Sequence, residues 1–171
     1  MKNISFRNDV LPLKDILYRL ALRITLNRED AEDIVQETLI KVWDKRDSWG
    51  EIESIEAFSL TICRNLALDY QRKMENRHLS LDETSVERPD SQTLSPSEAM
   101  ISTDRISLVR RLVDSLPEKQ RSCMQLRDFE GKSYKEIAQV LDITEDQVKV
   151  NIFRARQTIK QRFNEAEDYG L

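Results

Sequence analysis

Residues 133–162, SYKEIAQVLDITEDQVKVNIFRARQTIKQR, decide how the rest of the chain is interpreted. They contain two helix-start signals. Ser133 is followed three residues later by Glu136, and Thr144 begins the same pattern. The partner of Thr144 is Gln147. Each pair predicts a capping box, in which the hydroxyl and the longer side chain bond to backbone amide groups that a helix start leaves unpaired.

Apolar residues follow each start signal at helical spacing. The first segment places Ile137, Ala138 and Leu141 on one face, and the break comes at residues 142–143. The second segment repeats the pattern with Val148, Ile152, Ala155, Ile159 and Phe163. Two short helices joined by a tight turn form a helix-turn-helix, whose second helix enters the major groove of DNA.

The second helix of this motif is basic. Between residues 147 and 162 it has no acidic side chain, and its cations are Lys149, Arg154, Arg156, Lys160 and Arg162. The alternative is a solvated helix in an ordinary bundle. Because the capping, turn and charge signals agree, we interpret the segment as a DNA-binding helix.

The composition favours an all-α protein. Of 171 residues, 39% are hydrophobic and 34% are charged, whereas three glycines and four prolines provide little turn material for a sheet. No segment approaches the roughly 18 apolar residues of a membrane span, and the N-terminus lacks a secretory signal core. We therefore expect a cytoplasmic protein.

Few residues offer catalytic or metal chemistry. Cys63 and Cys123 lie in amphipathic patterns, so we expect buried, reduced thiols. His78 is the single histidine. Without a nucleophile constellation, metal cluster or phosphate loop, the sequence argues against an enzyme and predicts neither cofactor nor metal.

Charge is distributed unevenly along the chain. Residues 1–77 hold 13 basic and 14 acidic side chains. Residues 78–103 hold one basic and five acidic side chains, and residues 104–171 hold 13 basic and 12 acidic ones. The total of −4 therefore comes mainly from the middle. Local potential governs phosphate binding, so this total does not argue against a DNA-binding role.

The chain divides into two helical regions. Helical patterns at residues 10–26, 31–43 and about 54–76 predict a three-helix domain over 1–77, with Trp43 in the buried stripe of the second helix. Residues 78–103, rich in serine and acid, predict a flexible linker rather than a loop within one domain. Four helices then follow over 104–165, the third beginning at Ser133, with a tail at 166–171.

Three segments carry a resemblance to a known family: DAEDIVQETLIKVW (30–43), FSLTICRNLALDYQRK (58–73) and SLPEKQRSCMQLRDFEGKSYKEIAQVLDITEDQVKVNIFRARQTI (115–159). In this order they resemble RNA polymerase sigma factors of the sigma-70 family, in its small extracytoplasmic-function (ECF) group. The resemblance implies sigma domain two at 1–77 and sigma domain four at 104–165. It also implies binding to core RNA polymerase and promoter-specific transcription initiation.

The resemblance assigns roles to polar residues of the first domain. Those expected to bind the clamp helices of the largest polymerase subunit are Asp33, Gln36, Glu37 and Lys41, unless this face is merely solvated. Those expected at the −10 element are Trp49, Arg64, Asn65, Arg72, Lys73 and Arg77. Trp49 either stacks on an unpaired base or covers the domain core. Asp69 is expected to form a local salt bridge.

In the second domain the resemblance implies reading of the −35 element. The expected contacts are Ser133, Tyr134, Lys135, Thr144, Gln147, Lys149, Asn151, Arg154 and Arg156. Phe153 either wedges against the DNA backbone or packs. Residues 117–129 are expected to meet the flap of the second-largest polymerase subunit. Asp142 stands where the family commonly has glycine, and aspartate tolerates the left-handed backbone that this turn requires.

Two alternatives remain for the function. A stand-alone helix-turn-helix regulator would bind a palindrome as a dimer, but the sequence shows no dimer seam or sensing domain. A helical adaptor or anti-factor would bind protein alone, and the acid-free basic helix argues against it. The sigma-factor resemblance further implies an anti-sigma partner, often membrane-anchored, that clamps both domains.

Overall fold

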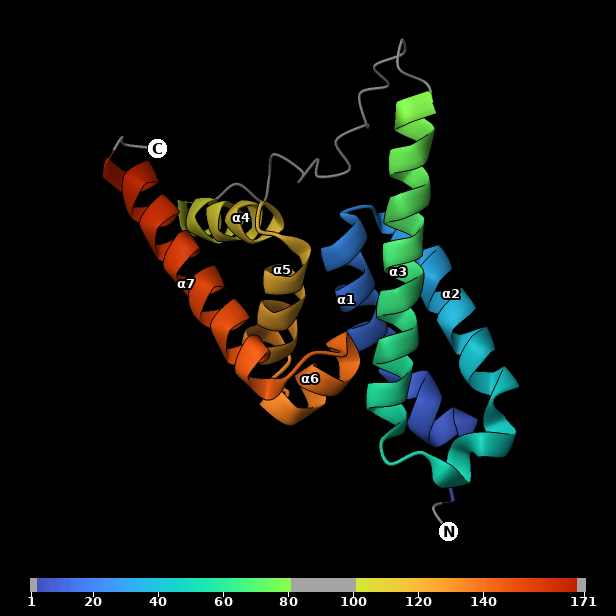
Figure 1. Ribbon diagram of the computed structural model, residues 1–171. Helices are drawn as coiled ribbons and strands as arrows, with labels where there is room; N and C mark the ends of the chain where they lie inside the picture. Colours follow the sequence, from blue (N-terminus) through green and yellow to red (C-terminus); the bar gives the residue numbers. More distant parts are fainter. Residues whose placement is uncertain (1–2, 81–100, 169–171) are drawn as a thin grey trace.

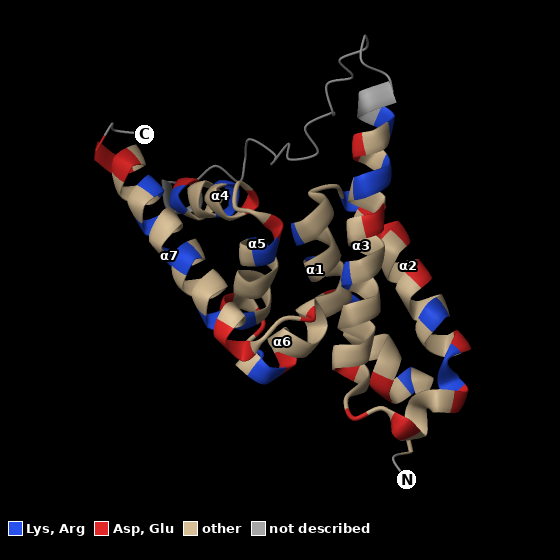
Figure 2. Ribbon diagram, in the orientation of Figure 1, with Lys and Arg blue, Asp and Glu red and all other residues tan. Residues whose placement is uncertain are grey.

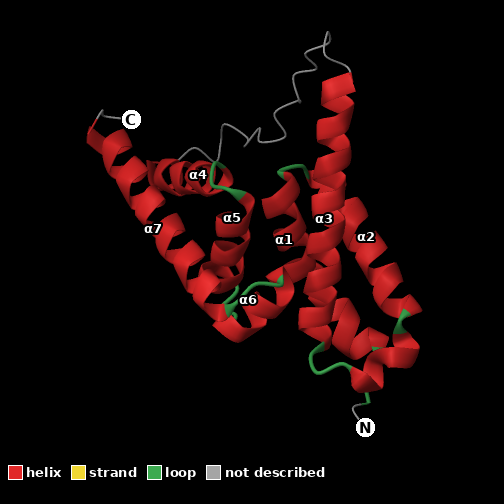
Figure 3. Cartoon of the chain, viewed as in Figure 1, coloured by secondary structure: helices red, strands yellow, loops and turns green. Residues whose placement is uncertain are grey.

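The computed structural model describes residues 3–80 and 101–168, with backbone alone at 78–80 and 101–103, and these ranges contain helices and turns without strands (Figures 1 and 3). The predicted all-α class is confirmed. Most of the predicted linker, residues 81–100, lies outside the described residues, but three residues at each of its ends are helical. In the described ranges, no helix has both the length and the apolar character required to cross a bilayer.

The first half, residues 3–80, contains three long helices: α1 (Lys14–Thr25), α2 (Arg28–Asp44) and α3 (Ile55–Ser80). Short turns η1 (Phe6–Val10) and η2 (Leu11–Leu13) precede α1, and η3 (Arg46–Glu51) joins α2 to α3. Asn27 caps α2, since its side-chain oxygen accepts from the amide of Asp30 at 3.0 Å.

The second half, residues 101–168, contains α4 (Ile101–Asp114), α5 (Glu118–Met124), α6 (Tyr134–Leu141) and α7 (Glu145–Asp168). The π-helical turn η5 (Gln125–Phe129) extends α5. Pro117 precedes α5 as its N-cap residue, and Gly131 has φ +71°, a left-handed conformation that glycine adopts without strain. The predicted order of four helices is therefore observed, with α7 continuing into the expected tail.

The two halves pack against each other rather than standing apart. In Figure 1, α5 and α6 lie beside α1 and α3, while α2 covers the far side of α3 and α7 the far side of α5. One continuous hydrophobic core joins them. Its fully buried members include, from the first half, Leu17, Leu20, Ile24, Leu60 and Cys63 and, from the second, Cys123, Leu126 and Ile137.

Polar contacts also cross between the halves. Arg19 donates from Nε and Nη2 to the carboxylate of Glu130, both at 2.7 Å. This hydrogen bonding holds the pKa of Glu130 below its ordinary value, so the carboxylate is charged at neutral pH. Arg23 reaches Asp114 and Gln125, each at 2.9 Å. Further links join Arg64 to Glu118, Lys132 to Glu56, and the buried Arg121 to the carbonyl of Ile24.

Because the core is shared, the two halves are expected to unfold together. Leu126→Ala, in the second half, should lower the free energy of unfolding by about 2–5 kcal/mol. Both tryptophans, Trp43 and Trp49, lie in the first half, so their fluorescence reports on that half. We expect the tryptophan and circular-dichroism transitions to shift by equal amounts.

The matched control is Ile106→Ala, since the Ile106 side chain is 53% exposed. Its effect on stability should stay within about 0.5 kcal/mol. A tryptophan transition that Leu126→Ala leaves in place, while the helical signal is partly lost, would contradict the shared core.

Candidate nucleic-acid interface

The predicted helix-turn-helix is formed by α6 and α7. At the start of α6, the Ser133 hydroxyl accepts from the amide of Glu136 at 3.1 Å. Before α7 the box is reciprocal, because Thr144 Oγ1 accepts from the amide of Gln147 at 3.1 Å and the Thr144 amide donates to Gln147 Oε1 at 2.9 Å. The predicted capping box before α7 is confirmed. Before α6 only the half made by Ser133 forms, because the Glu136 carboxylate accepts from the Ser133 hydroxyl at 3.2 Å.

The turn between these helices depends on a left-handed residue. Asp142 has φ +55°, and its amide donates to the carbonyl of Ala138. The expectation that aspartate takes the place of glycine here is confirmed. The next amide, of Ile143, donates to the same carbonyl at 3.1 Å, so two successive amides of the turn close the end of α6 on Ala138.

One face of α7 is buried, and the opposite, outer face carries polar and apolar groups together. Val148, Ile152 and Ala155 are buried, and the basic residues are spaced along the helix, with acidic residues only near its ends (Figure 2). A surface hollow of about 290 Å³ brings part of this face together. Its lining residues are Lys119, Ile143, Asp146, Gln147, Val150, Asn151 and Arg154.

Three of the predicted −35 residues, Gln147, Asn151 and Arg154, therefore share one hollow. Asn151 also donates from Nδ2 to the carbonyl of Gln147 at 2.8 Å. The sequence reasoning missed Val150, which is 44% exposed on the same face. Its position three residues after Gln147 was the available signal, because residues three apart on a helix lie on one face.

The remaining predicted −35 residues lie elsewhere. Lys149 stands over the ring of Tyr134 at 5.6 Å, and Arg127 stands over the same ring at 4.3 Å. Lys135 is exposed on α6. Phe153 is 60% exposed, which excludes the alternative that it is packed in the core.

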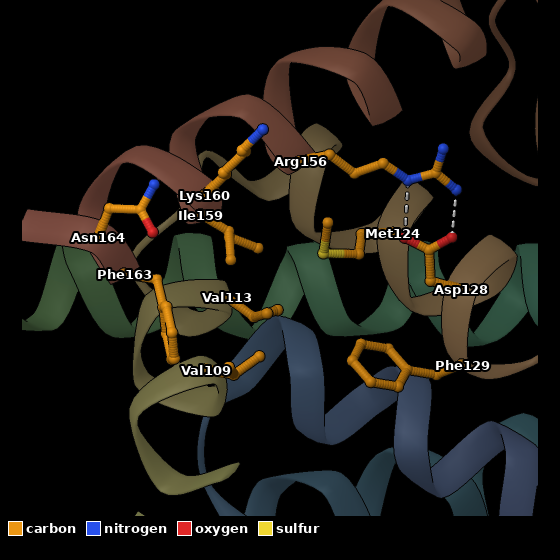
Figure 4. Close-up of a pocket in the computed structure, with 10 residues that line it drawn as sticks. All are labelled: Val109, Val113, Met124, Asp128, Phe129, Arg156, Ile159, Lys160, Phe163 and Asn164. Carbon is orange, nitrogen blue, oxygen red and sulfur yellow. Dashed lines mark hydrogen bonds and ion pairs between the residues drawn. The ribbon is translucent and has the colours of Figure 1, made fainter. Parts of the chain in front are cut away.

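Arg156 differs from its predicted pair mate Arg154. Its guanidinium forms two hydrogen bonds with Asp128 at the end of α5 and η5, which raise the pKa of Arg156 (Figure 4). The pair lies along an apolar groove of about 390 Å³ between α4, η5 and α7. The groove is lined by Val109, Val113, Met124, Asp128, Phe129, Arg156, Ile159, Lys160, Phe163 and Asn164. Arg156 is thus engaged on a different face from the hollow.

On α2, Asp33, Gln36 and Lys41 are exposed and Glu37 is half-buried, as the predicted polar face requires. Two large apolar side chains add to this region. Ile40 is 60% exposed and Trp43 is 44% exposed.

The expectation that Trp43 lies in the buried stripe is therefore wrong. Its ring instead meets Phe6 edge-on at 5.3 Å and lies under the guanidinium of Arg46 at 4.7 Å, because η1 folds back against the end of α2. Periodicity alone assigned Trp43 to the buried face, since it cannot show where η1 packs.

On α3, Asn65, Arg72, Lys73 and Arg77 are exposed, as predicted for DNA contacts. Asp69 forms the expected local pair, with Arg72 at 3.7 Å.

Two predicted −10 residues are not on this surface. Trp49 is only 7% exposed, and its indole N–H donates to the carbonyl of Val42 at 3.0 Å, so it covers a core instead of facing a base. Arg64 is 6% exposed and is bound to Glu118 of the second half. In this conformation neither side chain reaches DNA.

Known protein families match both halves of the chain, including the helix-turn-helix. Residues 10–77 match the family Sigma-70 region 2, and residues 106–159 match Sigma-70, region 4. The ECF RNA polymerase sigma-E factor of Escherichia coli (strain K12) is 31% identical over 140 residues, which cover 78% of this chain and 73% of that protein. The chain belongs to the ECF group of sigma-70 factors.

A second relative of this sigma factor is the ECF RNA polymerase sigma factor SigE of Mycolicibacterium smegmatis, 30% identical over 85% of this chain and 56% of that protein. Two solved structures share the fold. The sigma factor RpoE of Bartonella quintana, in complex with the anti-sigma factor NepR, has a TM-score of 0.72 and 23% identity over 94% of this chain and 96% of that one. CnrH, in complex with the cytosolic domain of CnrY, has a TM-score of 0.67 and 20% identity over 94% and 88%.

The two alternatives for Trp49 predict different consequences of its loss. In this sigma factor, Trp49→Ala should lower the free energy of unfolding by about 3 kcal/mol or more, because it empties a packed core. Trp49→Phe keeps one aromatic ring but loses the bond to Val42 and leaves a smaller cavity, at a cost of about 1–3 kcal/mol. Chemical denaturation measures both.

Phe153→Ala, which truncates an exposed ring, is the control and should change stability by less than about 0.5 kcal/mol. If Trp49→Ala kept full stability but weakened binding of single-stranded promoter DNA, the base-stacking alternative would hold instead.

Proposed function

We propose that this sigma factor holds promoter DNA at two points while bound to core RNA polymerase. In this proposal α7 reads the −35 element, and the exposed polar face of α3 contacts the −10 element during strand opening. The observation that carries it is the helix-turn-helix itself, in which α7 has no acidic residue between 147 and 162, and Gln147, Asn151 and Arg154 lie around one hollow. The protein acts by binding, with no catalytic chemistry of its own, in the cytoplasm beside the polymerase.

The −35 contacts divide by chemistry. Gln147, Asn151 and Arg154 offer hydrogen bonds to base edges, while the exposed methyl groups of Val150 suit the methyl group of thymine. Ser133 and Lys135, at the start of α6, lie where backbone amides and a cation bind phosphate.

At the −10 element, Asn65 is suited to a base edge and the cations Arg72, Lys73 and Arg77 to phosphates. All four side chains are exposed along the outer part of α3.

For core polymerase, we assign the clamp helices of the largest subunit to the α2 face. Asp33, Gln36 and Glu37 offer acceptors to a basic coiled coil, and the exposed Ile40 and Trp43 beside them add apolar contact. Interfaces commonly owe most of their affinity to a few such buried anchors.

The apolar groove beside α7 is a second docking site, which we assign to the flap of the second-largest subunit. Met124, Asp128 and Phe129 of the expected 117–129 segment line it, and Phe129 is 52% exposed. Because Arg156 is paired with Asp128, Lys160 is the cation at its edge that favours an amphipathic helix with an acidic residue. We further propose an anti-sigma partner, as in the two complexes of similar fold.

The proposal is tested by run-off transcription with purified core polymerase across genomic promoters. Initiation that depends on both the core enzyme and this chain supports it. Tight binding to a bare palindrome without such initiation would favour the stand-alone regulator, and binding to protein alone would favour the adaptor.

Arg154→Ala is expected to weaken promoter binding by the holoenzyme. If Arg154 contacts phosphate, the slope of log association constant against log salt should fall by about one; a base contact would relax sequence preference instead. Fluorescence anisotropy over a salt series measures both. Arg105→Ala, which removes an exposed cation of α4, is the control. Unchanged affinity, slope and preference would exclude Arg154 from the interface.

Ile40→Asp should weaken binding to core polymerase by more than about tenfold, because a buried charge would face the clamp helices. Ile106→Asp places the same charge at a similarly exposed isoleucine on α4 and should leave affinity unchanged. Competition against a labelled sigma factor measures the affinities. Equal affinities of the two variants would remove Ile40 from the contact.

A further inference from the structure

Arg64 is the one predicted DNA-contacting cation of α3 that the described structure buries. Its Nε donates to Glu118 Oε1 at 3.1 Å and its Nη2 to Glu118 Oε2 at 2.9 Å. Two parallel bonds from a guanidinium to two oxygens are also the geometry with which arginine binds a phosphate group. The carboxylate therefore satisfies the same donors that a DNA backbone would use.

Glu118 is held in place for this contact. It is the first residue of α5, where a negative charge is favoured by the helix dipole. The buried hydroxyl of Ser122 donates to Glu118 Oε1 at 2.7 Å. The carboxylate is thus oriented by its own helix, independently of the arginine that it meets.

We propose that Glu118 binds Arg64 in place of a DNA phosphate. DNA binding by the free chain is then autoinhibited until its two halves separate. The inference rests on the proposed function of α3 as a DNA-contacting helix. Opening frees Arg64, and DNA or polymerase that binds the open form shifts the population toward it.

Three of the four ion pairs between the described parts of the two halves have the same polarity, and Lys132 with Glu56 has the opposite one. Arg19 and Arg23 of α1 pair with Glu130 and Asp114 of the second half, and the Arg64 pair continues the series. Removing one partner of a buried ion pair is costly, whereas returning both partners to water together costs little, because each regains its hydration. Paired charges at this interface are therefore suited to a contact that opens and closes.

The two cysteines provide an internal reporter of opening. Cys123 is fully buried in the core that joins the halves, on the same helix as Glu118, and this burial raises its pKa to about 12. Cys63 lies within the first half, where its thiol donates to the carbonyl of Leu17 and burial raises its pKa to about 12. Opening exposes Cys123. Cys63 belongs to the same core, but its thiol is bonded to the carbonyl of Leu17 between α3 and α1, so its exposure requires the first half to unfold.

The test compares the full-length chain with Glu118→Gln, which keeps the side-chain shape but removes the charge. Maleimide labelling of each cysteine is followed by mass spectrometry, and binding of a fluorescent forked −10 duplex is measured without core polymerase. In Glu118→Gln, Cys123 should react with maleimide about tenfold faster, whereas the labelling rate of Cys63 should not change. The variant should also bind the forked duplex about tenfold more tightly. Both gains are expected because the fraction of open molecules limits Cys123 labelling and DNA binding alike. Glu167→Gln, at an exposed pair within the second half, should match the wild type.

Adding Arg64→Ala to Glu118→Gln separates opening from DNA contact. The double variant should keep the fast Cys123 labelling and lose the gain in fork binding. Unchanged Cys123 labelling in Glu118→Gln, equal acceleration at Cys63, or a gain in fork binding that survives Arg64→Ala would each overturn the inference. Failure of the wild-type chain in run-off transcription would instead overturn the proposed function, because the labelling measures opening without reference to transcription.

Discussion

The structure depends on the burial of the inner faces of α5 and α6 against α1 and α3. Each fully buried aliphatic side chain at such a contact contributes roughly 1.5–3 kcal/mol through removal of apolar surface from water. Leu126 and Ile137 of the second half join the same core as Leu17 and Leu60 of the first. α5 has only seven residues and α6 has eight, so neither is long enough to be stable as an isolated helix. Packing against the first half stabilises the scaffold on which the recognition helix is mounted.

The helix-turn-helix was predictable from the sequence because its signals are local. A capping box spans four residues and a turn spans fewer, so Ser133, Thr144 and Asp142 carry their own evidence. The same holds for Asp69, whose partner is one helical turn away. Helix order and the polar face of α2 follow from periodicity in the same way.

The predictions that failed concern contacts between segments far apart in the sequence. Periodicity shows that α3 has buried residues, but it does not show that a second domain covers another side of the helix. Ala57, Leu60, Cys63 and Ala67 form one buried stripe with the charged Arg64, and Ser59 and Leu66 are buried on the adjacent side, so the buried surface is wider than a single stripe. Arg64 and Glu118 are 54 residues apart, and neither has a local feature that identifies the other. For Trp49 the sequence left two alternatives open, and its burial depends on Val42 and on the distant Val10, which belong to the same small core.

The reciprocal box before α7 limits which bases Gln147 can recognise. Its Oε1 already accepts from the amide of Thr144, so the side chain keeps two amide hydrogens but only one further acceptor site for the proposed DNA contact. An adenine edge requires both a donor and an acceptor from glutamine, whereas the O6 and N7 atoms of guanine, or the O4 atom of thymine, require donors alone. Asn151 has the opposite balance, because one of its amide hydrogens is bound to the Gln147 carbonyl while its Oδ1 remains an acceptor. While these bonds last, Gln147 offers more donors than acceptors and Asn151 more acceptors than donors to the proposed −35 contact.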